Sequence, residues 1–423
     1  MSRGRVGGNA SGEGCVPAAN PLARNSLSHS RTSVTGGAVT ARTEQVRAAP
    51  RRSPVLSAGR SVGAQMRRDR DSANLDLLRA IALIAVVSVH VLGFLSVIPP
   101  GSPLLRMGRF AVLLFFVHTS LVLTQSLARR YRGERWSDLL GHFLVRRCFR
   151  IYPLSILLVL TVFTFKIPAA DIGVWSIHYV DLGVRGLLAN LLLVQNLTYT
   201  PSIAGQLWSL PLEMQMYVLL PFLFLLAHRT TSVRPLLGLW VAALGLALVQ
   251  PLISDRLDLG QFVPTFLPGI IAYHLTGTTR RSWPSWAWPV FLGALWAAYR
   301  FSRPYDHGWV LCLLAGLALP HFRELRHTWV RGAAHELAKY SYGTYLTHVF
   351  ALWLAFVRLG ALPLAGRWAV FLVLLVSLPV LLYHTLEAPL IRYGTRLADR
   401  WFPQRADGTT LSSPTDRTIA WPA

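Results

Sequence analysis

The sequence predicts an all-α, polytopic integral membrane protein with about ten transmembrane helices and both termini in the cytoplasm. Three observations lead to this fold class. Only 14% of the 423 residues are charged and 52% are hydrophobic, whereas about a quarter of the residues in a typical soluble domain are charged. The mean hydropathy is positive, at +0.41. Long apolar runs recur between residues 75 and 386, as expected for helices that cross a bilayer.

Composition divides the chain into three regions. Residues 1–65 are rich in Ser, Gly, Ala and Arg and lack apolar periodicity, which predicts a disordered basic tail. A start codon assigned too far upstream explains this stretch as well, and we favour Met66 as the start because a basic flank follows it before the first apolar run. We expect the transmembrane domain over residues 66–394 and a short cytoplasmic tail over residues 395–423.

Ten apolar segments are the expected spans, although several are shorter than the ~20 residues that a perpendicular span needs. In chain order they cover residues 75–98, 109–127, 151–167, 207–227, 234–253, 261–276, 284–300, 308–320, 338–358 and 367–387.

A further segment over residues 184–199 is apolar but carries Asn190, Gln195 and Asn196. We expect it to form a half-membrane or interfacial helix rather than a span, because polar side chains are costly in the hydrocarbon core.

The distribution of basic residues supports ten spans. Arginines gather in alternate loops, above all between residues 128 and 150, whereas the intervening loop at residues 168–183 carries Asp171 and Asp181. Ten spans place every strongly basic loop in the cytoplasm, and an eleventh would reverse the later loops. The same distribution accounts for the net charge of +23 without the contiguous basic face that a nucleic-acid partner requires. The three cysteines are far apart and predict neither disulfides nor a metal site.

The first expected span carries two ionisable residues, Arg79 and His90. Eleven steps of ~100° make about three turns, so both side chains lie on one helix face, roughly 16 Å apart along the axis. A single arginine near a helix start is also typical of a side chain that reaches the headgroups, and a lone histidine is often only hydrogen-bonded in the interior. The pair on one face is harder to explain in that way and indicates a polar track leading inward from the cytoplasm.

Three more polar segments border expected spans. Arg147 and Arg150 are three residues apart and share a face if the segment is helical. Paired guanidinium groups are suited to binding phosphates. The same two residues also fit a basic flank that only anchors the cytoplasmic end of a span. Glu213 stands near the start of a span behind Trp208 and could orient an imidazole or accept a substrate hydroxyl, or lie half-exposed at the outer interface. Residues 340–348 form another polar entry into a span.

Six short motifs follow one another in the chain. They are Leu75-Asp76-Leu77-Leu78-Arg79 with His90, Phe115 to Ser120, Arg147 to Pro153, Trp208-Ser209 with Glu213, Gln215 and Tyr217, Ser341-Tyr342 with Tyr345, Leu346 and His348, and Tyr383 with Glu387 and Pro389. In their order they resemble the motifs of the membrane-bound acyltransferase-3 family of O-acyltransferases, over residues 74–394. Each motif alone is a weak signal, whereas six in the right order are specific.

The chain departs from the family pattern in two places. Leu77 replaces a glycine of the first motif, and Thr119-Ser120, preceded by His118, replaces a Ser-Gly pair. These departures leave His90 and Glu213 in place, but they leave the identity of the acceptor open. Few residues follow Glu387, so we expect the stand-alone form, without the extracytoplasmic esterase-like domain of some members.

The resemblance implies a reaction and roles for the residues. Acyl-CoA, commonly acetyl-CoA, would be a cytoplasmic co-substrate, with no bound cofactor and no metal. The acceptor would be the hydroxyl of a glycan, a lipid-linked sugar or a metabolite, and the bilayer would be that of the bacterial inner membrane. His90 would act as general base or form an acyl-His intermediate, Glu213 would orient His90 or the acceptor, and Arg79, Arg147 and Arg150 would bind the CoA phosphates. Supporting roles would fall to Asp76, Trp208, Ser209, Gln215, Tyr217, Ser341, Tyr345, His348 and Glu387.

A competing interpretation is a proton-coupled transporter in which the intramembrane Arg, His and Glu side chains form a relay. Transporters of this kind often contain internal repeats with paired broken helices. The two halves of this sequence show no convincing similarity to each other. Acyl transfer is therefore the function that the sequence favours.

Overall fold

The structure is a computed structural model that describes residues 72–99, 102–167, 170–172, 175–177, 181–254, 258–301 and 307–404. Within these ranges the chain is helical, apart from connecting segments and one short antiparallel hairpin of β1 (Ala170–Ile172) and β2 (Trp175–Ile177). The basic tail predicted over residues 1–65 lies outside the described residues. For the part of the chain that the structure describes, the helical fold class is confirmed.

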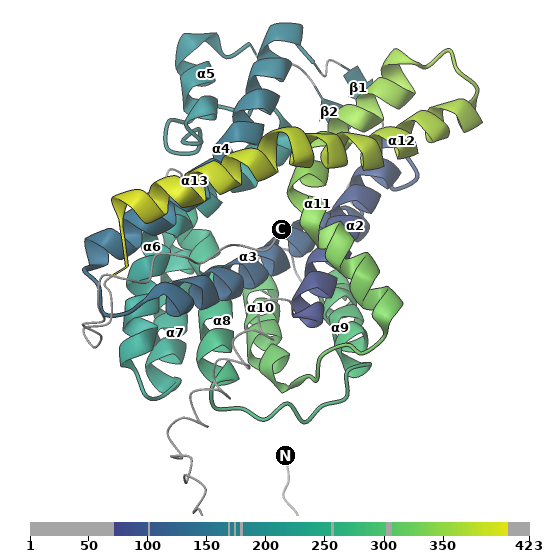
Figure 1. Ribbon diagram of the computed structural model, residues 1–423. Coiled ribbons are helices and arrows are strands. Elements are labelled where there is room, and N and C mark those ends of the chain that lie inside the picture. Colours follow the sequence, from purple (N-terminus) through teal and green to yellow (C-terminus); the bar gives the residue numbers. More distant parts are fainter. Residues whose placement is uncertain are drawn as a thin grey trace, which may run out of the picture. The chain divides into compact units, whose positions relative to one another are not determined.

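The helices follow the expected apolar segments (Figure 1). In chain order they are α2 (Ala73–Phe94), α3 (Pro103–Arg130), α4 (Trp136–Phe165), α5 (Gly183–Leu191), η2 (Gly205–Trp208), α6 (Ser209–Arg229), α7 (Arg234–Ile253), α8 (Leu259–Thr276), α9 (Ala287–Phe301), α10 (His307–Ala318), η4 (Leu319–His321), α11 (Thr328–Trp353), η5 (Leu354–Arg358), α12 (Leu364–Leu382), η6 (Tyr383–Glu387) and α13 (Ala388–Trp401). Among the described residues, 6 helices are long and apolar enough to cross a membrane. The protein is thus an integral membrane protein, whereas the count of ten spans and the side on which the termini lie stay predictions.

The arginine-rich segment between residues 128 and 150, expected as a loop, is mostly helical. α3 continues to Arg130 and α4 begins at Trp136, so only residues 131–135 connect the two helices. Arginine is a good helix former. The 30 residues of α4 make a helix ~45 Å long, which exceeds the ~30 Å hydrocarbon core. The basic residues of α4 therefore stand on a rigid extension of a membrane helix.

The C-terminal helix α13 passes without interruption through the domain boundary predicted at residue 394. Figure 1 shows it lying along α4, with which it packs. Glycines allow this close approach, because a Cβ at Gly141 would meet the Phe402 ring and one at Gly394 would meet Phe149. The side chains of His142 and Asp399, 2.9 Å apart, add a polar contact between the two helices. The start of the predicted tail is therefore part of the packed structure.

The segment expected over residues 184–199 contains the nine-residue helix α5 and a series of turns. Nine residues span only ~14 Å. Asn190 lies fully buried at its end, where its amide nitrogen donates to the Gly186 and Pro201 carbonyls and its oxygen accepts from the Ile203 backbone at 2.9 Å. The polar side chain that argued against a span thus fixes the turn that leads into η2 and α6.

Helix α2 packs between α3 and α11, and α3 in turn packs against α8. Gly269 of α8 permits the closest of these contacts, because a Cβ there would collide with the Ser120 side chain. Ser120 is fully buried and its hydroxyl donates to the Phe266 carbonyl at 2.6 Å. Because α2 packs between these two helices, its face that carries Arg79 and His90 points into the protein, toward α3 and α11.

Candidate active site

Arg79 contacts groups inside the helical bundle. Its Nε donates to the Ser341 hydroxyl of α11 at 2.6 Å, and its guanidinium carbon lies 5.1 Å from the centre of the Phe115 ring of α3. Ser341 is itself buried and its hydroxyl also donates to the Ala338 carbonyl. The arginine is therefore held by hydrogen bonding and by an aromatic face, rather than reaching along the helix to the headgroups.

His90 lies next to a second histidine, His348 of α11. The two ring centres are 4.9 Å apart and the rings meet edge to face, at 73°. Nδ1 of His90 lies 2.8 Å from the Val86 carbonyl, which can only accept, so Nδ1 carries the hydrogen and Nε2 carries the lone pair. The neutral imidazole of His90 is thus in the tautomer that a general base needs.

His348 repeats this arrangement at a fully buried position. Its Nδ1 donates to backbone carbonyls, 2.8 Å from Tyr345 O and 3.1 Å from Thr344 O. Its Nε2 is buried and has no hydrogen-bond partner among the described residues. A buried acceptor without a partner is uncommon and calls for an explanation. Here it lies beside the imidazole predicted to do the chemistry, and we call His90 and His348 the histidine pair.

Glu213 lies in the first turns of α6 and is buried. Tyr217, one turn later on the same helix, donates a short hydrogen bond to its Oε1. The guanidinium groups of Arg79, Arg147 and Arg150 are the cations that interact electrostatically with this carboxylate. The structure therefore brings Glu213 together with the three predicted donor-binding arginines.

Arg150 forms an ion pair with Glu387, with 3.0 Å between Nη1 of the arginine and Oε2 of the glutamate. The Glu387 side chain is 2% exposed. Glu387 is the last residue of the π-helical turn η6, which follows the proline Pro379 of α12. Gly343 of α11 packs against this turn, since a Cβ there would lie 3.2 Å from Pro379 and 3.3 Å from a Glu387 oxygen. Two residues 237 positions apart are thus joined inside the bundle.

Arg147 completes this group. Its guanidinium lies 5.8 Å from the centre of the Phe143 ring, and its buried Nε has no hydrogen-bond partner among the described residues. The resulting charged cluster has one more positive than negative group. Its members are Arg79, Arg147, Arg150, Glu213 and Glu387. Buried charges need compensation, so this excess favours an anionic ligand.

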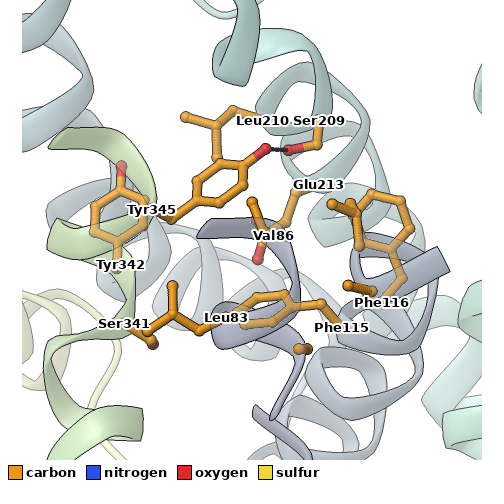
Figure 2. A pocket seen from close by; sticks show the side chains of 13 residues that line it. Leu83, Val86, Phe115, Phe116, Ser209, Leu210, Glu213, Ser341, Tyr342 and Tyr345 are labelled. Carbon is orange, nitrogen blue, oxygen red and sulfur yellow. Dashed lines mark hydrogen bonds between the residues drawn. The ribbon is translucent and has the colours of Figure 1, made fainter. Parts of the chain in front are cut away.

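Two cavities adjoin these groups. The small pocket, of about 40 Å³, lies among α2, α3, α6 and α11, and Figure 2 shows Glu213, Ser341 and Phe115 on its walls. The wide cavity, of about 520 Å³, is lined by His90. Both are lined by Val86, Val112 and Tyr345. Glu213 of the charged cluster and His90 of the histidine pair therefore border neighbouring spaces.

The remaining predicted residues fall into two groups. Trp208 lines the wide cavity, and Ser209 lies 3.0 Å from the Tyr345 hydroxyl, which donates to the Gln206 carbonyl (Figure 2). Gln215 and Asp76 line neither cavity. Gln215 exchanges amide hydrogen bonds with Asn196, and Asp76 pairs with His335 at 3.0 Å.

Three residues at the site were not predicted. Gln206 donates to the Leu346 carbonyl at 2.9 Å, and Tyr342 donates to the Ile151 carbonyl at 2.7 Å. Arg109 lines the wide cavity. Tyr342 belongs to one of the motifs and Gln206 stands two residues before another, so both have a sequence signal, whereas Arg109 begins an apolar span and looks like an ordinary basic flank. Among the described residues, no group of His, Cys, Asp or Glu side chains is arranged to hold a metal ion.

A family model described as an acyltransferase domain matches residues 72–385. The match begins at the N-cap of α2 and ends within η6, so it contains every predicted site residue except Glu387. No curated protein and no solved structure matches the chain.

Proposed function

The chain belongs to the acyltransferase-3 family and is a membrane acyltransferase, and from that premise we propose that it moves an acetyl group from cytoplasmic acyl-CoA to a hydroxyl. The acceptor would be a glycan or a glycosylated metabolite, and the membrane would be the bacterial inner membrane. The observation that carries the proposal is the position of His90, which lines a cavity of about 520 Å³ with Nδ1 held by the Val86 carbonyl.

The chemistry follows from the position and the tautomer of His90. His90 takes the proton of the acceptor hydroxyl while the oxygen attacks the thioester carbonyl, so a C–O bond forms and the C–S bond then breaks. The proton passes to the departing thiolate, which leaves the ester and free CoA as products. Positioned proton transfer of this kind contributes about 10²–10⁴-fold in rate.

The charged cluster would serve the donor. Arg79, Arg147 and Arg150 offer guanidinium groups to the CoA phosphates. The net positive charge of the cluster supports this role, although Arg150 already has a carboxylate partner. The pantetheine arm would carry the thioester from this cluster toward His90, across the ~16 Å that separates the two residues along α2.

Glu213 would act mainly on the donor side. The sequence suggested that it orients His90 or the acceptor. Its hydrogen bond with Tyr217 and its electrostatic interaction with the arginines support a role in arranging Arg79 for the donor. Removal of the carboxylate would then affect donor binding more than proton transfer.

The proposal is tested by His90→Ala in membranes that contain the protein. We expect transfer of labelled acetyl from acetyl-CoA to fall by about 10²–10⁴-fold, with protein level unchanged; acylated glycans and extracted metabolites would be measured by mass spectrometry. His321→Ala is a matched control, because that histidine bonds the carbonyl four residues earlier, Leu317, but lines neither cavity. Full activity of His90→Ala would remove His90 from the mechanism. Movement of an unmodified solute by the wild type would support transport instead.

A further inference from the structure

The walls of the wide cavity are mainly apolar. Aliphatic and aromatic side chains from five parts of the chain line it, among them Val89, Leu158, Val162, Val349 and Phe350. Its volume of about 520 Å³ falls in the range of pockets that hold whole small molecules, ~300–1,000 Å³. The space is therefore large enough for a substrate body and not only for a reacting group.

Most polar side chains of the lining already have partners within the protein. The Tyr345 hydroxyl donates to the Gln206 carbonyl, and the Gln206 amide donates to the Leu346 carbonyl. The Ser202 hydroxyl accepts from Gln195 at 3.4 Å. A saccharide that buried many hydroxyls here would leave several of them without hydrogen bonds, and each would weaken binding. The wall suits a ligand whose buried part is largely apolar.

The small pocket indicates how the donor reaches the wide cavity. It shares Val86, Val112 and Tyr345 with that cavity, and at about 40 Å³ it has room for only a few atoms, which suits the narrow pantetheine arm. An acetyl group held at His90 fills only a small part of the wide cavity, so the rest of that space is left to the acceptor. We propose that the acceptor is an amphipathic alcohol that places one hydroxyl at His90 and its apolar body against the valine-rich wall. This inference rests on the proposed acyl transfer and narrows its acceptor class.

The probe is a matched pair of glucosides, octyl and methyl β-glucoside, which carry the same sugar and differ in the apolar tail. A photoreactive diazirine analogue of octyl glucoside would be incubated with the full-length protein in native membranes, below the concentration at which octyl glucoside forms micelles. Labelled peptides would be identified by mass spectrometry. We expect labels on the walls of the wide cavity, from residues 86–90, 105–112, 158–167, 202–208 and 345–350, reduced at least tenfold by excess octyl glucoside and unaffected by methyl glucoside.

Gly205→Leu tests the cavity itself. Gly205 lines the cavity, and a Cβ there would meet nothing within 4 Å, so a leucine side chain begins in open space at the cavity wall. We expect labelling to fall about tenfold and the KM for a transferred acceptor to rise similarly, with an unchanged KM for acetyl-CoA. Gly238→Leu is the matched control, since Gly238 also has open space around its Cβ but lies exposed on α7.

Three results would overturn the inference. Equal competition by methyl glucoside would point to a saccharide ligand. Protection by long-chain acyl-CoA, but not by octyl glucoside, would assign the cavity to the acyl chain. Labels spread evenly over lipid-facing residues, unchanged in Gly205→Leu, would mean partition into the bilayer. Failure of the proposed function would give a different result from these three. The wild type would transfer no acetyl group, yet labelling of the cavity would persist, and the bound ligand would then not be an acceptor.

Discussion

The charged cluster and the histidine pair lie on the same side of α2 but satisfy their polar atoms in opposite ways. In the cluster, Arg150 meets Glu387, Arg79 meets Ser341 and Glu213 meets Tyr217. In the pair, each imidazole uses Nδ1 on a backbone carbonyl, and Nε2 of His348 is buried without a partner among the described residues. The first region is held by side-chain contacts, one of them an ion pair, whereas in the second each imidazole is fixed by a backbone carbonyl of its own helix.

This difference separates two kinds of mutational effect. Removal of one member of a paired cluster leaves its partner charged and buried, so the main effect falls on folding. Replacement of an uncharged imidazole leaves no buried charge behind, so it does less harm to the fold and the effect falls on rate. The predictions below begin with the largest effect and test whether each region behaves as its pairing implies.

Glu387→Ala should have the largest effect on stability. It leaves the Arg150 guanidinium without its carboxylate at a site where Glu387 is 2% exposed, and loss of one member of a buried pair costs about 3–5 kcal/mol. The measurement is the midpoint of thermal unfolding in detergent, by size-exclusion chromatography of the heated protein. The double variant Arg150→Met/Glu387→Met should recover much of the stability, because neither charge is then left alone. Equal stability of the single and double variants would contradict the pairing argument.

His348→Asn and His348→Gln should separate the two nitrogens of His348. The amide nitrogen of Asn imitates the Nδ1 donor, whereas the amide oxygen of Gln imitates the Nε2 acceptor. We expect Nε2 to matter, because it is a buried acceptor beside the ring that gains a proton. A hydrogen bond to a charged group contributes about 1.5–3 kcal/mol, so the Asn variant should lose about ten- to hundredfold in kcat.

The Gln variant should retain more kcat than the Asn variant, with similar KM values for both substrates. The contrary result, rescue by Asn and not by Gln, would mean that His348 only ties its side chain to the Thr344 and Tyr345 carbonyls. His348→Phe keeps an aromatic ring without either nitrogen, so its kcat should be the lowest of the series.

Arg147→Gln should raise the KM for acetyl-CoA by about tenfold, the value of one weakened charge-assisted contact. Arg147 is the better test of donor binding than Arg150, because within the described part of the chain it makes no salt bridge whose loss would unfold the protein. The comparison donor is acetyl-pantetheine, which lacks the CoA phosphates. Its KM should be the same in Arg147→Gln and the wild type. A parallel rise for both donors would leave Arg147 without a role in phosphate recognition.

The sequence predicted the helices well and the connections among site residues poorly. Long apolar runs identify α2, α3 and α6 because length and hydropathy are local properties. The sequence predicts a loop where the Arg-rich start of α4 lies, because charge marks the end of the membrane and not the end of a helix. Neither the Arg150–Glu387 pair nor the contact of His90 with His348 has a local signal, since tertiary packing alone brings these helices together.

Gln215 illustrates the smallest effect and a limit of motif reasoning. It belongs to the same motif as Glu213, yet its amide pairs with Asn196 in the segment that follows α5 and lines neither cavity. Gln215→Ala should therefore lower the stability by about 1 kcal/mol, the net value of a lost hydrogen bond, and leave kcat and both KM values unchanged. Asn196→Ala/Gln215→Ala should cost little more than the single change, because neither amide is then left unpaired. A fall in kcat at a temperature where Gln215→Ala is folded would instead show that this residue helps to position the charged cluster.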